Sequence, residues 1–220
     1  MTTVTFIIPT IGRESLKNSI ESLKNQTIKT WKAIIIFDGI KCNINEDDNR
    51  VKLVEIEKAG RDYNSAGDVR NHGMSLVDTE WIAFLDDDDK LSNDYLEIFH
   101  KEIELYPYID TLIFRMKLND RYVPDLNTNN FYICDVGISF IIKTQIFNDG
   151  IKFNPSGAED FYYLDNIRKN NYIMMISPYV KYFVRENSTN HLIVNVPKGN
   201  RVIINNINSL ITFFGYNNLV

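Results

Sequence analysis

Apolar runs and amphipathic stretches alternate along the first half of the chain. Four runs rich in Val, Ile and Phe predict strands, and they cover residues 4–8, 31–37, 51–56 and 81–85. Leu16, Ile20 and Leu23 recur at the spacing of one helix face, and a second helix is expected over about 66–77. Strands that alternate with helices are typical of βαβ units, so this half predicts a mainly parallel sheet flanked by helices.

The pattern is less regular after residue 90. Leu96, Phe99 and Ile103 predict a helix over 93–105, and Pro107 ends it. The remaining expected elements are strands at 110–118, 136–147 and 172–185, a hairpin and loop at about 120–130, and a helix at 159–170. No repeat, low-complexity tract or flexible linker marks a boundary, so we expect one α/β domain over 1–220.

Composition and charge narrow the class of protein. The chain has 220 residues, of which 44% are hydrophobic, enough for one sizeable core. Its formal net charge of -5 argues against sequence-independent binding of nucleic acid, because such binding needs clustered Lys and Arg. No secretory signal is recognisable, and no run reaches the roughly 18 apolar residues of a membrane helix. We expect a soluble, cytoplasmic protein with no transmembrane segment, and its oligomeric state is open.

A run of four acids, residues 86–89, directly follows the fourth predicted strand. Ligands of α/β sheets bind beyond the carboxyl ends of the strands, where the strand order switches. Adjacent carboxylates repel one another unless a cation or solvent compensates. Asp86 and Asp88 could hold a hard divalent ion, Mn²⁺ or Mg²⁺, together with diphosphate oxygens. A solvated acidic turn is the alternative interpretation.

Three further places lie at predicted strand ends: Pro9 to Arg13, Asp38 with Gly39, and the loop 60–73. Asp38 could accept a hydrogen bond from the imide of a uracil or from a ribose, or could be an ordinary turn aspartate. The loop brings Arg70 to a loop-to-helix junction, where free backbone N–H groups and positive charge favour an anion. A helix start preceded by ordinary glycine turns would explain the same residues.

Six motifs in one order carry a resemblance: TFIIPTIGR with SIESLKNQT, IIIFDG, NSAGDVRNHGM, AFLDDDD, GAED and YFVRENSTNH. In this order they resemble family 2 glycosyltransferases with the GT-A fold, over about residues 3–191. Each motif alone is unspecific, whereas their joint order is highly specific. Compact members of similar size occur among large DNA viruses, a source that the composition would suit.

The resemblance implies a Rossmann-like, mainly parallel central sheet with a smaller antiparallel portion on the acceptor side. It divides the domain into a nucleotide-sugar-binding half at about 1–90, an acceptor and catalytic half at about 91–191, and a C-terminal segment at 192–220. The nucleotide-sugar site would be lined by Pro9, Thr10, Arg13 and Asp38, with Arg70 near the diphosphate.

Five further residues match functional positions of the family. Asp86 and Asp88 match the outer acids of its Asp-x-Asp metal motif, and Asp87 would face the ribose or the sugar. Asp160 matches the catalytic base, although the helix dipole alone favours acids at a helix start. His191 matches a late metal or diphosphate ligand of some related enzymes, although a lone His is more often a surface residue.

The function implied is metal-dependent, inverting transfer of a sugar to a hydroxyl of a glycan or other acceptor, in glycan biosynthesis. UDP is the expected nucleotide, on its frequency in the family. A non-catalytic nucleotide- or glycan-binding module is one alternative. A sugar nucleotidyltransferase is another, but PTIGRESLK lacks the glycine-rich loop that such enzymes need after the first strand. The acceptor is the least determined part, because the Arg-x-x-Trp element that often follows GAED has no counterpart here.

Overall fold

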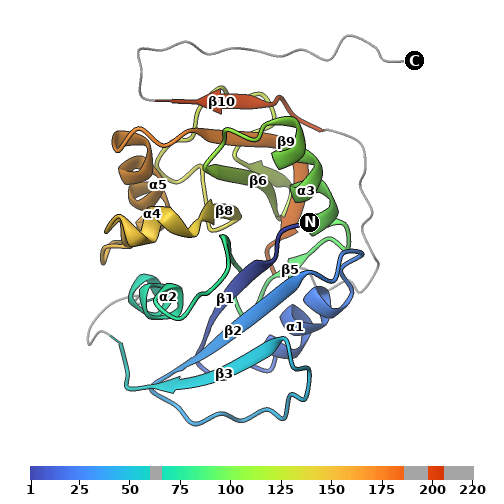
Figure 1. The fold of residues 1–220 in the computed structure, drawn as a ribbon, viewed down its shortest axis with the longest axis vertical. Coiled ribbons are helices and arrows are strands. Elements are labelled where there is room, and N and C mark those ends of the chain that lie inside the picture. The colour runs from blue at the N-terminus through green and yellow to red at the C-terminus, as the bar shows by residue number, and fades with distance from the viewer. Residues whose placement is uncertain (60–65, 186–197, 206–220) are drawn as a thin grey trace.

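The computed structural model describes residues 1–59, 66–185 and 198–205 (Figure 1). The strands are β1 (Val4–Thr10), β2 (Trp31–Asp38), β3 (Val51–Ile56), β4 (Trp81–Phe84), β5 (Lys90–Leu91), β6 (Thr111–Leu118), β7 (Arg121–Val123), β8 (Phe140–Lys143), β9 (Met174–Phe183) and β10 (Val202–Ile204). The helices are α1 (Leu16–Lys24), α2 (Ala66–Met74), α3 (Tyr95–Leu105), α4 (Thr144–Asn148) and α5 (Glu159–Lys169). In this part of the chain no helix is long and apolar enough to cross a membrane.

The described strands form one sheet with a parallel part and a mixed part. Strands β3, β2, β1 and β4 are neighbours in that order and are parallel. Strand β8 pairs antiparallel with both β4 and β6 and links the two parts. Beyond it, β6 and β9 are parallel, while β5, β7 and β10 pair antiparallel with them. The predicted α/β fold and the hairpin near residue 120 are confirmed.

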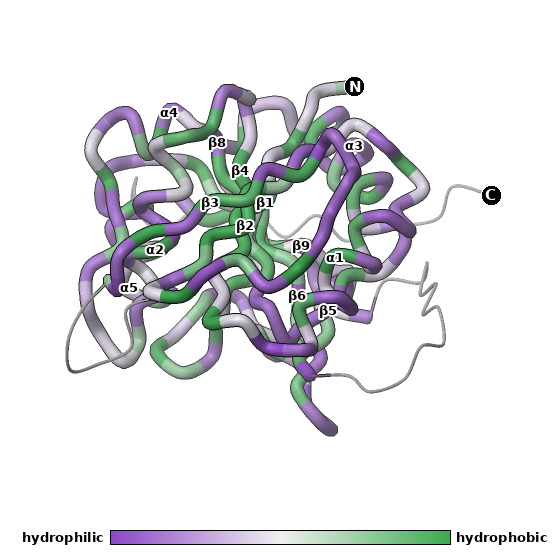
Figure 2. Tube along the Cα trace, turned by 90° about the horizontal axis from the view of Figure 1, so that it is seen from below, coloured by the Kyte–Doolittle hydropathy of each residue, from purple (hydrophilic) through white to green (hydrophobic). Residues whose placement is uncertain are grey.

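Helices cover both faces of the sheet. In Figure 1, α2, α4 and α5 lie on one side and α1 and α3 on the other. Figure 2 shows the hydrophobic residues gathered along β1, β2 and β4 and the hydrophilic ones on the surrounding loops. The central strands are buried on both faces, which explains their continuous apolar runs. Stacked rings of Phe153 and Tyr163, 3.9 Å apart, help to fix α5 to this core.

The predicted strand over 136–147 is wrong in its extent. Only β8 is a strand, and the chain turns directly into α4 at Thr144. There, the backbone N–H of Thr144 donates to the carbonyl of Glu80 at 2.8 Å and its hydroxyl to the carbonyl of Thr79 at 2.6 Å. Residues on both sides of this turn are buried, so the sequence shows one apolar run. Tertiary hydrogen bonds, which local pattern does not report, decide where the strand ends.

Candidate active site

A cleft of about 380 Å³ lies at the carboxyl ends of β1, β2 and β4. The strand order switches here, because β2 and β3 lie on one side of β1 and β4 lies on the other. The cleft brings together nine of the residues singled out in the sequence: Pro9, Thr10, Arg13, Asp38, Arg70, Asp86, Asp87, Asp88 and Asp160. His191, the tenth, lies outside the described residues.

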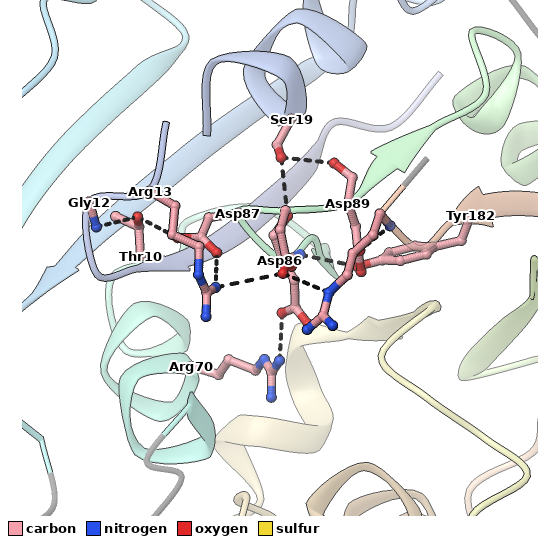
Figure 3. A network of polar contacts seen from close by, with 11 residues as sticks. Thr10, Gly12, Arg13, Ser19, Arg70, Asp86, Asp87, Asp89 and Tyr182 are labelled. Atoms are coloured by element: carbon pink, nitrogen blue, oxygen red, sulfur yellow. Dashed lines mark hydrogen bonds and ion pairs between the residues drawn. The ribbon is translucent and has the colours of Figure 1, made fainter. Parts of the chain in front are cut away.

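The four acids 86–89 form a turn whose backbone is held from two neighbouring elements (Figure 3). The N–H of Asp89 donates to the carbonyl of Asp86 at 3.1 Å within the turn. The hydroxyl of Ser19 on α1 donates to the carbonyl of Asp89 at 2.8 Å. The hydroxyl of Tyr182 on β9 accepts the N–H of Asp86 at 3.1 Å. Ser19 and Tyr182 are absent from the sequence prediction, because no local pattern connects them with acids so distant along the chain.

Asp87 is buried and its carboxylate is held inside the protein (Figure 3). The hydroxyl of Thr10 donates to its Oδ2 at 2.6 Å, and Nη1 of Arg13 lies 2.5 Å from its Oδ1. Burial lowers the pKa of Arg13, but this hydrogen bond and the nearby acids raise it by more. Asp87 therefore orders the end of β1, and its contact with a ribose or sugar stays a prediction.

Asp86 and Asp88 line the cleft, and each is paired with an arginine. Nη2 of Arg70 donates to Oδ1 of Asp86 at 2.6 Å, and Nε of Arg185 donates to Oδ2 of Asp88 at 3.0 Å. Among the described residues, none donates a hydrogen bond to the other oxygen of either acid. Such hard oxygens suit Mn²⁺ or Mg²⁺, so the two acids fit part of a divalent-ion site. Residues 1–59, 66–185 and 198–205 contain no cluster of three or more His, Cys, Asp or Glu that could hold an ion alone.

Arg70 on α2 is buried and joins three carboxylates. Glu159 accepts from Nη1 of Arg70 at 2.5 Å and, through its other oxygen, from the backbone N–H of Gly67 at 2.9 Å. A Cβ at Gly67 would lie 2.6 Å from that oxygen, so only glycine fits there. Burial lowers the pKa of Arg70, but Asp86, Asp160 and Glu159 raise it by more. Glu159 thus positions Arg70, a role with no local signal, because its partners lie 89 and 92 residues away in sequence.

Asp160 lies at the start of α5, beside Arg70. Its Oδ1 is 3.7 Å from Nη1 of Arg70 and, although buried, has no hydrogen-bond partner among the residues described. Burial raises the pKa of Asp160 to about 7, with further increases from Asp86 and Glu159 and an opposing effect of Arg70. A carboxyl group with this pKa can exchange a proton near neutral pH.

Asp38 at the end of β2 is engaged by the neighbouring strand end. Its carboxylate accepts from Nζ of Lys58 and, at 2.6 Å, from the backbone N–H of Ala59. Gly39 has a φ of 71°, and a Cβ there would come within 2.8 Å of the Lys58 side chain. Lys58 also lines the cleft and is missing from the sequence prediction. It follows β3 by two residues, so the rule that ligands bind at parallel strand ends could have found it.

The parallel part of the sheet, with the cleft at its strand ends, has the GT-A fold, as the solved structures below show. The chain belongs to glycosyl transferase family 2, whose sequence profile matches residues 5–186. It is similar to the poly(ribitol-phosphate) beta-N-acetylglucosaminyltransferase TarP of Staphylococcus aureus, with 28% identity over an alignment of 231 positions that covers 91% of this chain and 69% of TarP.

Two solved structures show the same fold. S. aureus TarS 1-349 in complex with UDP matches with a TM-score of 0.66 and 20% identity, over 83% of this chain and 60% of that one. Mannosyltransferase PcManGT from Pyrobaculum calidifontis, in complex with GDP-Man and Mn²⁺, matches with a TM-score of 0.63 and 17% identity, over 86% and 59%. Two further curated relatives are matched over only 15% and 24% of their length. The chain therefore corresponds to part of these proteins.

Proposed function

We propose that the protein transfers a sugar from a nucleoside-diphosphate donor to a hydroxyl of a glycan or other acceptor, with inversion at the anomeric carbon. The observation that carries this proposal is Asp160, which has a buried oxygen without a hydrogen-bond partner among the described residues and a pKa raised to about 7. Such a group can act as a general base towards a hydroxyl at neutral pH. Membership of family 2 supports sugar transfer as the reaction.

The cleft described above is the proposed donor site and is called the donor cleft below. UDP is the proposed nucleotide, and the complex of TarS with UDP supports it. Pro9, Thr10 and Arg13 would line the nucleotide side. Asp38 would act there through Lys58, whose ammonium group has two further protons to donate to a base carbonyl or a phosphate.

Asp86 and Asp88 would hold Mn²⁺ or Mg²⁺, each through the oxygen that its arginine leaves free. The complex of PcManGT with GDP-Man and Mn²⁺ supports a metal in a site of this fold. When bound, the ion would neutralise negative charge on the leaving diphosphate. His191 stays the proposed additional ligand.

In the proposed reaction, Asp160 takes the proton of the acceptor hydroxyl. The acceptor oxygen attacks the anomeric carbon from the side opposite the diphosphate, and the bond between that carbon and the diphosphate oxygen breaks. One displacement of this kind inverts the configuration without a covalent intermediate. Arg70, held by Glu159, would keep a fixed positive charge beside the acids during this step.

Calorimetric titration tests the donor site. UDP and other nucleoside diphosphates are titrated into the protein with Mn²⁺ and again with EDTA. We expect one nucleotide to bind in the presence of metal, and binding to weaken at least about 10-fold in EDTA or in Asp88→Ala, since the diphosphate then lacks its counter-charge. No binding of any nucleotide in either condition would contradict the proposal.

Substitution of Asp160 tests the chemistry. Asp160→Asn should retain UDP binding and lower transfer at least about 100-fold, the lower range for loss of a general base. Asp165→Asn is the matched control, because Asp165 lies on the same helix but pairs with Arg168 and Lys169 outside the cleft. Unchanged transfer by Asp160→Asn would refute the base assignment. Nucleotide binding with no transfer to any acceptor would instead favour a non-catalytic module.

A further inference from the structure

A second cavity, of about 290 Å³, adjoins the donor cleft. Asp86, Asp88, Asp160 and Arg185 line both spaces, so a molecule in the second cavity would lie against the proposed base. The rest of the lining comes mostly from the end of β6, from β7 and from residues 134–138. The second cavity is therefore placed to hold the molecule that receives the sugar.

The lining of the second cavity combines charged and aliphatic side chains. The charged residues are acids of the 86–89 turn, Asp160, Arg121 and Arg185. The aliphatic residues, called the aliphatic side below, are Met116, Leu118, Val123, Val136, Ile138 and Val184. Met116, Val123 and Ile138 are buried, whereas the other three aliphatic residues are half-buried and leave surface open to a ligand. Among the described lining residues no aromatic ring offers a platform for a sugar.

These two kinds of lining set which groups an acceptor can bring against them. A hydroxyl placed against aliphatic side chains gives up its hydrogen bonds to water and gains no partner, which is unfavourable. A methyl group in the same position is removed from water and gains apolar contact. Hydroxyls are compensated on the acidic side, where carboxylate oxygens can accept from them. The second cavity thus favours a sugar unit with hydroxyls on one edge and an alkyl substituent on another.

We propose that the second cavity selects an acceptor sugar that carries a methyl group, as in a 6-deoxyhexose or an N-acetylhexosamine. The methyl group lies against Leu118, Val136 and Val184, and the reacting hydroxyl faces Asp160. The volume of about 290 Å³ is at the lower limit for ligand pockets, which suits one sugar unit. The proposal rests on the proposed function, because it assumes that Asp160 receives the proton of this acceptor.

Matched pairs of acceptors test the selection. Galactose is compared with 6-deoxygalactose, and glucose with N-acetylglucosamine, at a saturating concentration of the donor, so that only one member of each pair carries a methyl group. At least one methyl-bearing member should show a kcat/KM about 10-fold or more above its partner, the range expected when a buried hydroxyl lacks a hydrogen-bond partner. The pair that responds distinguishes the two sources of the methyl group. Equal or reversed preference in both pairs overturns the proposal.

A nearly isosteric substitution tests whether the aliphatic side is responsible. Val136→Thr keeps the side-chain volume and adds a hydroxyl that can pair with one on the sugar, so it should reduce the preference for the methyl group several-fold. Val54→Thr is the matched control, since Val54 is half-buried on β3 and lines neither space. Val54→Thr should leave the preference unchanged. An unchanged preference in a folded Val136→Thr protein also overturns the proposal.

Direct binding separates failure of this proposal from failure of the proposed function. In protein labelled with ¹³C at Met and Val methyl groups, the signals of Met116 and Val136 are followed on addition of each sugar, with and without UDP. The methyl-bearing sugar of each pair should shift these signals at lower concentration than its hydroxyl counterpart. If UDP binds but no sugar shifts them, the acceptor proposal fails and the donor site stands. If UDP does not bind, the proposed function fails whatever effect the sugars have.

Discussion

The donor cleft and the second cavity share a wall, yet they are built differently. The donor cleft is lined by charges that pair with one another, such as Arg70 with Asp86 and Glu159, and Lys58 with Asp38. Away from the shared wall, the second cavity is mostly aliphatic. Removing one member of a buried charge pair is strongly unfavourable, whereas small changes of aliphatic shape are tolerated. We therefore expect electrostatics to determine which donor binds, and shape and apolar contact to determine which acceptor binds.

Removal of Glu159 should have the largest effect and tests the charge network. Glu159→Ala leaves the buried Arg70 without one partner and the N–H of Gly67 without an acceptor. Breaking such a pair costs about 3–5 kcal/mol of unfolding free energy. Misplacement of Arg70 should lower kcat about 100-fold. Urea unfolding and steady-state kinetics measure the two effects.

Two control variants distinguish positioning from general loss of structure. Glu159→Gln keeps an oxygen for Gly67 and should lose less stability than Glu159→Ala. If Glu159 positions Arg70, the Gln variant should still lower kcat by more than it raises the KM for the donor. Glu104→Ala removes an exposed glutamate on α3 and should change neither quantity. A folded Glu159→Ala protein with normal kcat would show that the network does not position Arg70.

The pH dependence of transfer tests Asp160, which lines both spaces, as the base. Burial raises the pKa of Asp160 to about 7, so the base is lost as the pH falls through that value. Below about pH 7, kcat/KM should fall roughly tenfold per pH unit. Burial also raises the pKa of Asp89 to about 7, so Asp89→Asn is the control. The pH profile should persist in Asp89→Asn. If it disappears in that variant, the pH dependence comes from Asp89 and not from Asp160.

The two regions also differ in how far the sequence predicts them. The donor cleft follows buried apolar runs that end in polar residues, so Asp38 and the acids 86–89 are visible locally. Glu159 escapes prediction because its partners are on α2, far away in the chain. The second cavity combines the end of β6 with residues 134–138, where the predicted strand is wrong. Its lining depends on long-range packing, which a periodic pattern does not encode.

The stability of Asp160→Asn tests whether ionisation of Asp160, which lines both spaces, opposes folding. A pKa of about 7 in the folded state, above the usual value near 3.9, means that ionisation of Asp160 opposes folding. This penalty grows as the pH rises from about 4 to 7 and is complete above 7. In EDTA, Asp160→Asn should therefore exceed the wild type by about 1–4 kcal/mol of unfolding free energy at pH 8 and by little at pH 4. Urea unfolding at both pH values checks this, and a variant less stable than wild type at pH 8 would contradict it.

A change in the second cavity should have the smallest effect. A Cβ at Gly137 would lie 2.5 Å from Sδ of Met116, so Gly137→Ala must displace that flexible side chain. The loss of stability should be about 1 kcal/mol. Because Met116 lines the second cavity but not the donor cleft, the KM for the acceptor should rise several-fold while the Kd of UDP stays unchanged.

Gly157→Ala is the control for this substitution, since nothing lies within 4 Å of the added Cβ. It should leave the Kd of UDP and the KM for the acceptor unchanged. Parallel losses of donor and acceptor affinity in Gly137→Ala would mean that the two spaces respond as one site. Electrostatics and apolar shape would then not divide the choice of donor from the choice of acceptor, and the difference between the two regions would have no functional meaning.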